Sequence, residues 1–214
     1  MIITYHGLEF FKVQFGDTIL AFNPISKKSK LKTTRFGANI ALVTIDHGDM
    51  NGSDQVAFGD KAPFIASGPG EYEISGIFIK GYPTESMYGG GAHRNTMYTV
   101  TLEGMNICFL GALSKDLDPV AEEELDGIDV LFVPIGGGGV LDPAAAYKIA
   151  VNLEPKIIIP MHYGEGAEST PGKALKTFLK EAGEEKLTSV DKLTLKKKDL
   201  EGKEAEVIVL QSNT

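Results

Sequence analysis

Hydrophobic and polar positions along the first half of the chain predict a series of short strands. Runs of about five apolar or alternating residues recur between turns rich in glycine, proline and aspartate. Gly16-Asp17 and Glu103-Gly104-Met105 have the composition of hairpin turns. The predicted strands are Met1–Tyr5, Glu9–Phe15, Thr18–Phe22, Asn39–Thr44, Pro63–Ala66, Glu71–Ile74, Ile77–Lys80, Thr96–Leu102 and Asn106–Leu110.

The second half changes to strands that alternate with helices. Asp142 suits an N-cap and Pro143 the first helical position, so we predict a helix that ends near Leu153. Hairpins followed by strand–helix units predict two packed sheets with helices outside, an α/β (α+β) fold. Because no repeat or linker divides the chain, we expect one domain over residues 1–214. The other predicted elements are strands Val130–Val133, Ile157–Pro160 and Glu206–Leu210, and helices near Ser53–Phe58, Pro119–Leu125 and Gly172–Ala182.

Charge and composition restrict the partners. The formal net charge of -8 disfavours nucleic acid. No apolar run approaches the roughly 20 residues of a membrane helix, and the first residues do not resemble a signal peptide. The single cysteine, Cys108, lies in an apolar run typical of a core strand, which fits a reducing compartment. We therefore expect a cytoplasmic protein with neither nucleic acid nor membrane as partner.

Candidate chemistry follows two of the predicted strands. Thr44-Ile45-Asp46-His47-Gly48-Asp49-Met50 comes after an apolar run, and Met161-His162-Tyr163-Gly164 comes after a second one. Imidazole and carboxylate groups placed past strand ends are the usual way to build a zinc or di-metal hydrolytic centre. The sequence therefore points to a site formed by His47, Asp49 and His162.

The chain resembles the metallo-β-lactamase-fold hydrolases, in particular a compact branch similar to ascorbate-6-phosphate lactonases and other Zn-dependent hydrolases. The resemblance implies a four-layer αββα sandwich with a dinuclear metal centre at one edge. It depends on short blocks that keep a shared order through most of the chain. These are Ile3–Tyr5, Leu20–Pro24, Leu42–Thr44, Gly68–Ile74, Asn95–Tyr98, Phe109–Gly111, Asp129–Gly137 and Ile159–Tyr163.

The metal ligands of that family are only partly present. The family motif Thr-His-x-His-x-Asp-His keeps its second histidine as His47 and its aspartate as Asp49, and His162 keeps the terminal histidine. In the family, His47 would serve one metal, while Asp49 and His162 would serve the other. Expected ligands are replaced by Ile45, by Met50, by Ala112 at the bridging aspartate, and by Glu85 or Ser86 at a further histidine.

These losses predict that the family's hydrolysis does not operate. Zinc generally needs three protein ligands, and without a metal the bound water is not activated at neutral pH. We expect no cofactor, and a degenerate protein that binds a small molecule or protein at the former cleft. We favour a hydrogen-bonded cluster of His47, Asp49 and His162, in which Asp49 accepts from an imidazole.

Other uses of these three residues stay open. They could form a mononuclear zinc or manganese site that hydrolyses a phosphorylated sugar, lactone or phosphodiester. They could also form a metal-free acid/base site. A structural or oligomer-forming module is a further alternative.

Two glycine-rich segments complete the prediction. His93 and Arg94 lie in the segment Tyr88–Asn95, which we expect to be a loop; folded over the cleft, Arg94 would bind a phosphate or carboxylate. A plain surface loop is the alternative. For Gly136–Gly139 we expect tight backbone packing rather than phosphate binding, because Asp142 at the following helix start would repel an anion.

Overall fold

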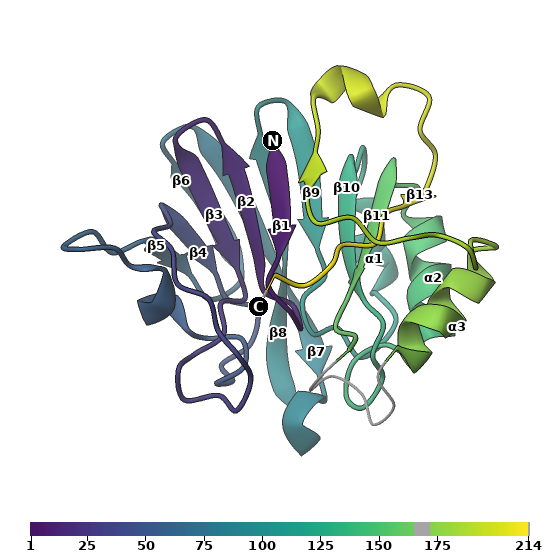
Figure 1. Ribbon diagram of the computed structural model, residues 1–214, viewed down its shortest axis with the longest axis horizontal. Helices are drawn as coiled ribbons and strands as arrows, with labels where there is room; N and C mark the ends of the chain where they lie inside the picture. The colour runs from purple at the N-terminus through teal and green to yellow at the C-terminus, as the bar shows by residue number, and fades with distance from the viewer. Residues whose placement is uncertain (165–171, 214) are drawn as a thin grey trace.

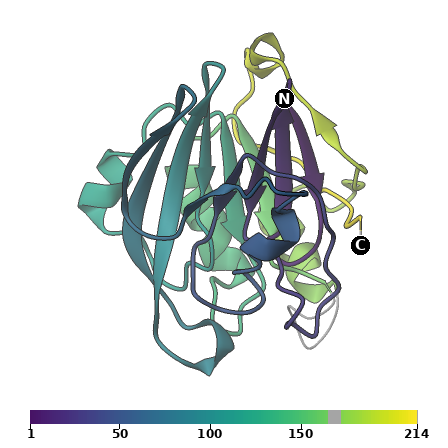
Figure 2. The same cartoon turned by 90° about the vertical axis from the view of Figure 1, so that its left-hand side faces the viewer.

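The computed structural model describes residues 1–164 and 172–213 and contains two β-sheets packed face to face (Figures 1 and 2). The six-stranded sheet has the order β12 (Leu193–Thr194), β1 (Ile2–Tyr5), β2 (Phe11–Phe15), β3 (Thr18–Phe22), β4 (Ile40–Leu42), β5 (Phe64–Ala66). The seven-stranded sheet has the order β13 (Glu206–Val207), β11 (Ile157–Met161), β10 (Val130–Pro134), β9 (Met105–Phe109), β8 (His93–Leu102), β7 (Ile77–Ser86), β6 (Gly70–Ile74).

Alternation along the strands builds the core between the sheets. Leu20 and Phe22 of β3 pack in this central cluster with Phe109 and Phe132 of the facing sheet. Ala21, between them in sequence, belongs to a different cluster on the outer face. Successive side chains of a strand point to opposite faces, so this period of two buries both sides of the six-stranded sheet.

Helices and short turns form the outer layers. The helices α1 (Pro119–Glu123), α2 (Pro143–Asn152) and α3 (Lys173–Glu181) belong with the seven-stranded sheet, and α2 and α3 lie beside β10, β11 and β13 (Figure 1). The outer face of the six-stranded sheet packs against residues of the 3-10 turn η1 (Ser53–Val56) and of loop 25–38. The predicted αββα sandwich is confirmed, with one outer layer made mainly of loop.

Parallel pairing brings the candidate residues to one edge. β3, β4 and β5 run parallel to one another, and so do β9, β10, β11 and β13. The carboxyl end of β4 leads into residues 43–50, and that of β11 leads into His162. The N-cap prediction for α2 is confirmed, because the Asp142 carboxylate accepts from the backbone N–H groups of Ala144 and Ala145 at 3.0 and 2.9 Å.

The main departure from the sequence-based prediction is a longer hairpin. The predicted strands Ile77–Lys80 and Thr96–Leu102 extend to Ile77–Ser86 and His93–Leu102, with Ser86 opposite His93. The expectation that His93 and Arg94 lie in a loop is therefore wrong. The two strands pair up to both sides of the turn that contains the glycines, so both residues belong to β8.

Smaller differences affect the ends of elements. The predicted strand Glu206–Leu210 is a strand only over Glu206–Val207, and Ser53–Phe58 gives one 3-10 turn. The turns η2 (Tyr88–Gly90) and η3 (Lys197–Leu200) and strand β12 were not predicted. Cys108 lies in β9 as expected, fully buried, and burial raises the pKa of its thiol to about 12.

No helix among residues 1–164 and 172–213 is both long and apolar enough to cross a membrane.

Candidate functional site

His162 is held in place by a buried carboxylate. Its Nδ1 lies 2.6 Å from Oε1 of Glu9, and neither side chain is exposed. The other oxygen of Glu9 accepts from the side-chain amide of Asn23 at 2.7 Å. With Nδ1 donating to the carboxylate, Nε2 is the nitrogen that remains, and it is buried without a hydrogen-bond partner among the described residues. A carboxylate behind an imidazole is the arrangement that orients histidines in metal sites.

The backbone around this pair is strained. His162, Leu8 and Asn23 adopt left-handed conformations with φ of 60°, 51° and 44°. The His162 N–H donates to the Leu8 carbonyl at 2.5 Å, and the Asn23 side chain exchanges two hydrogen bonds with Thr44 at 2.9 Å. A left-handed backbone conformation at a non-glycine residue is energetically unfavourable, and such residues are common at functional sites in proteins. The network therefore marks this edge as a site.

His47 and Asp49 form a second pair beside the first. The Asp49 backbone N–H donates to Nδ1 of His47 at 3.2 Å, and the Asp49 carboxylate lies 3.5 Å from that nitrogen. The carboxylate accepts from the hydroxyl of Ser29 and from that of Tyr88, the latter at 2.8 Å. Hydroxyl groups, rather than an imidazole of the expected cluster, are thus the donors closest to Asp49.

Tyr88 packs against both histidines. Its ring centroid is 5.0 Å from that of His47 and 5.0 Å from that of His162, edge-on to both at 85° and 82°. Burial and the hydrogen bond to Asp49 raise the pKa of Tyr88, so the phenol is neutral and donates its proton. Its ring therefore links the three residues that the family resemblance keeps.

Three of the positions where the resemblance implies metal ligands form part of an apolar cluster. Ile45, Met50 and Ala112 are at most 2% exposed and pack in the same cluster on the outer face of the six-stranded sheet, with Tyr88 against it. Ser86 is buried and accepts from the backbone N–H of Tyr88 at 3.1 Å, while Glu85 pairs with Lys115. Ile45, Met50 and Ala112 therefore present hydrocarbon at their positions, whereas Ser86 and Glu85 have polar partners.

Among the described residues, the possible donors for a zinc or manganese ion are dispersed. Within residues 1–164 and 172–213, no group of three histidine, cysteine, aspartate or glutamate side chains is placed to hold one. His47 and His162 each face the ring of Tyr88 at 5.0 Å, and a thioether such as Met50 suits copper(I) rather than zinc.

The other predicted residues lie outside this cluster. The His93 ring is 6.4 Å from that of His47, and Arg94 is exposed on β8, opposite Glu85. The glycine segment packs tightly at its two ends, whereas a β-carbon at Gly137 or Gly138 would meet open space. A β-carbon at Gly136 would collide with the His162 carbonyl oxygen, and one at Gly139 would lie 2.6 Å from the Met87 carbonyl oxygen.

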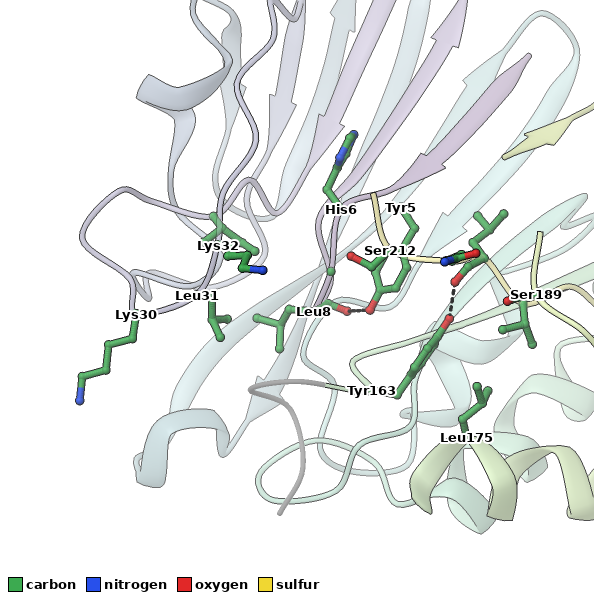
Figure 3. Close-up of a pocket in the computed structure, with 16 residues that line it drawn as sticks. Tyr5, His6, Leu8, Lys30, Leu31, Lys32, Tyr163, Leu175, Ser189 and Ser212 are labelled. Atoms are coloured by element: carbon green, nitrogen blue, oxygen red, sulfur yellow. Dashed lines mark hydrogen bonds between the residues drawn. The ribbon is translucent and has the colours of Figure 1, made fainter. Parts of the chain in front are cut away.

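A cavity of about 670 Å³ adjoins the site (Figure 3). Two residues that line the cavity connect it to the site. Leu8 is one of the residues with a strained backbone, and Tyr163 directly follows His162 in the sequence. A concave, mostly apolar space of this size suits a small ligand.

Sequence reasoning missed four residues of the site. They are Glu9, Asn23, Ser29 and Tyr88. Glu9 had a signal, since it is a carboxylate inside an otherwise apolar segment, Leu8-Glu9-Phe10-Phe11. Tyr88 had none, because its role depends on where the β7–β8 hairpin turns.

Comparisons with known proteins agree with the fold. The sequence profile of the Beta-lactamase superfamily domain matches residues 2–162. A "UPF0173 metal-dependent hydrolase" of Thermococcus kodakarensis is 31% identical over 171 residues, covering 69% of this chain and 75% of its own length. One from Listeria welshimeri is 27% identical over 194 residues, covering 76% and 85%.

Solved structures show the same arrangement. A Thermotoga maritima protein described as a Zn-dependent hydrolase of the metallo-beta-lactamase superfamily is 27% identical, with a TM-score of 0.76 over 99% of both chains. A Parabacteroides distasonis protein described as a metal-dependent hydrolase is 21% identical, with a TM-score of 0.66 over 98% of this chain and 93% of its own.

Proposed function

Since the chain belongs to the beta-lactamase superfamily and is a homologue of proteins named metal-dependent hydrolases, we propose that it has lost their metal centre and acts by binding a small molecule or protein. The observation that carries this proposal is the place of Tyr88, whose ring packs against both His47 and His162 and whose hydroxyl donates to Asp49. An ion bound by Asp49 together with these histidines would compete with the Tyr88 hydroxyl for the carboxylate and with its ring for space beside the imidazoles.

The apolar cluster supports the same conclusion. In the family pattern, Ile45, Met50 and Ala112 stand where histidine or aspartate ligands are expected, and here they are buried together. No local shift turns these side chains into oxygen or nitrogen donors for zinc. What this chain's own residues still supply is a buried polar network, His162–Glu9–Asn23–Thr44.

The test is the metal content and turnover of the full chain. We expect protein purified from medium supplemented with zinc and manganese to hold far less than one metal ion per chain by elemental analysis. Titration of either ion should give no saturable heat at micromolar protein. Stoichiometric metal in the wild-type protein that is lost in Asp49→Asn and His162→Ala would overturn the proposal.

A reduced, mononuclear hydrolase is the second candidate, and one observation favours it. Nε2 of His162 is buried without a partner among the described residues, and Glu9 orients the ring from behind. Turnover of a phosphodiester or lactone probe that needs zinc or manganese, and that His47→Ala or His162→Ala abolishes, would establish this candidate. Equal background rates for the wild type and both variants would exclude it.

A further inference from the structure

We propose that the cavity beside the site binds a small organic anion with an apolar body and one carboxylate or phosphate end. This inference rests on the proposed binding function and names its ligand class. The cavity is lined by parts of the chain that are far apart in sequence, including the end of β1, loop 25–32, Tyr163 and Gly164 after β11, α3 and segment 209–212. Its volume of about 670 Å³ lies in the range of pockets that enclose small molecules.

The walls of the cavity are mostly apolar. Leu8, Ile25 and Leu31 come from two loops, and Leu175 of α3 and Leu210 come from the C-terminal part. Figure 3 shows Leu8 and Leu31 on one side of Tyr163 and Leu175 on the other. Surface of this kind is buried favourably by a hydrocarbon or aromatic ring.

Two tyrosines add aromatic surface rather than free donors. The Tyr5 hydroxyl donates to the Leu8 carbonyl at 3.0 Å, and the Tyr163 hydroxyl donates to the Leu210 carbonyl at 2.7 Å (Figure 3). Their rings lie 5.6 Å apart. Burial raises the pKa of both phenols, so neither carries a negative charge that would repel an anion.

The charge of the described lining residues is opposite to that of the whole protein. The sixteen described residues that line the cavity include Lys30 and Lys32 but no aspartate or glutamate, whereas the chain has a net charge of -8. In Figure 3 the Lys32 side chain turns toward the cavity, while Lys30 extends outward from its rim. Lys32 is therefore the cation placed to meet the charged end of a ligand.

His6 contributes a neutral group. Its ring turns away from Tyr163 and packs against Phe10 and Phe36 at 5.1 and 5.5 Å. Burial, with the nearby charge of Lys12, lowers the pKa of His6 to about 4. At neutral pH the fixed charge of the described lining is thus that of the two lysines.

Calorimetric titration of the full chain with four compounds tests this inference. The four share a phenyl ring and a short alkyl chain, and end in a carboxylate (4-phenylbutyrate), a phosphate (3-phenylpropyl phosphate), an alcohol (4-phenylbutanol) or an amine (4-phenylbutylamine). We expect the two anions to bind at least about five-fold more tightly than the alcohol, as one charge-assisted contact gives, and the amine to bind least. The ratio between carboxylate and phosphate identifies which anion the cavity prefers.

A matched pair of lysine variants locates the charge. Lys32→Gln should weaken the binding of both anions about five-fold and leave that of the alcohol unchanged, since it removes charge but little volume. Lys28→Gln changes an exposed lysine of the same loop that does not line the cavity, so it should bind all four compounds like the wild type. Because the chain has seven tyrosines and no tryptophan, a change in tyrosine fluorescence would report contact with Tyr5 and Tyr163.

The outcomes separate this inference from the proposed function. Equal or tighter binding of the amine, equal effects of the two lysine variants, or no saturable binding of any compound would overturn the anion site. Metal found in the wild-type protein while the anions still bind through Lys32 would overturn the loss of the metal centre and leave the cavity assignment standing.

Discussion

Ala112 occupies a position where one side chain matters for the proposed loss of the metal centre. The family pattern expects a bridging aspartate at this position, and the structure has a fully buried methyl group that packs in one cluster with Ile45 and Met50. Its backbone N–H donates to the side-chain oxygen of Asn95 at 3.1 Å, which helps to fix the loop. A carboxylate at position 112 would contact the hydrocarbon side chains of this cluster.

Restoring that carboxylate should therefore destabilise the protein. We expect Ala112→Asp to lower the free energy of unfolding by about 3–5 kcal/mol at neutral pH, the cost of an uncompensated buried charge. Ala92→Asp, at an exposed position of a nearby loop, should change it by less than about 0.5 kcal/mol. Urea denaturation measures both. An Ala112→Asp protein as stable as the control, or one that zinc stabilises, would show that a usable donor set persists.

At the level of elements, the loop after β10 determines how closely the backbone approaches His162. Gly136 lies against the His162 carbonyl, and Gly139, with φ of 116°, lies against Met87 just before Tyr88. The absence of β-carbons at these two positions lets three segments meet at the site. Gly136 and Gly139 thus allow close packing of the backbone at the site.

A methyl group at Gly136 tests this role. Gly136→Ala should cost about 1–3 kcal/mol of stability, because either the loop or His162 must move. Gly68→Ala provides the control, since a β-carbon there has open space, and it should be close to neutral. Thermal unfolding compares the two variants. If Gly136→Ala were as stable as Gly68→Ala, the close approach would not constrain the site.

Elements with clear periodicity or caps were predictable from the sequence. The α2 cap at Asp142-Pro143 and the strand Thr18–Phe22 agree with the structure, because local residue types determine both. His93 and Arg94 were misplaced, because their glycine-rich context hid their pairing with Ser86 and Glu85 across the β7–β8 hairpin. The Glu9–His162 contact joins residues 153 positions apart, and no local pattern encodes such a pair.

At the scale of the whole molecule, Asp129 ties the C-terminal part to both sheets. This buried carboxylate precedes β10 and accepts from Lys156 at 2.7 Å and from Lys197 at 2.6 Å. Lys197 lies in η3, just after β12 of the other sheet. Burial raises the pKa of Asp129, but the hydrogen bonds from Lys156, Lys197 and the Asn106 N–H outweigh it and lower the pKa below its usual value.

This lowered pKa predicts a pH-dependent contribution to stability. The contribution is complete above the unfolded pKa of about 3.9 and is lost as the pH falls through the lower folded value. Asp129→Asn should cost about 2 kcal/mol at pH 7, and its difference from the wild type should shrink below about pH 4. Urea denaturation at several pH values measures this. Asp60→Asn, at an exposed residue, should show no such effect, and a constant difference for Asp129→Asn would refute the ionic role.

The pairing of β1 with β12 has a consequence for how the chain acquires its structure. β1 starts at Ile2, yet its outer neighbour comes from Leu193–Thr194, so nearly the whole polypeptide must be available before that ladder closes. Such distant contacts slow folding, and until they form the first strand presents unpaired backbone groups to other chains. We therefore expect this protein to be most prone to aggregation after β1 has been synthesised and before β12 pairs with it.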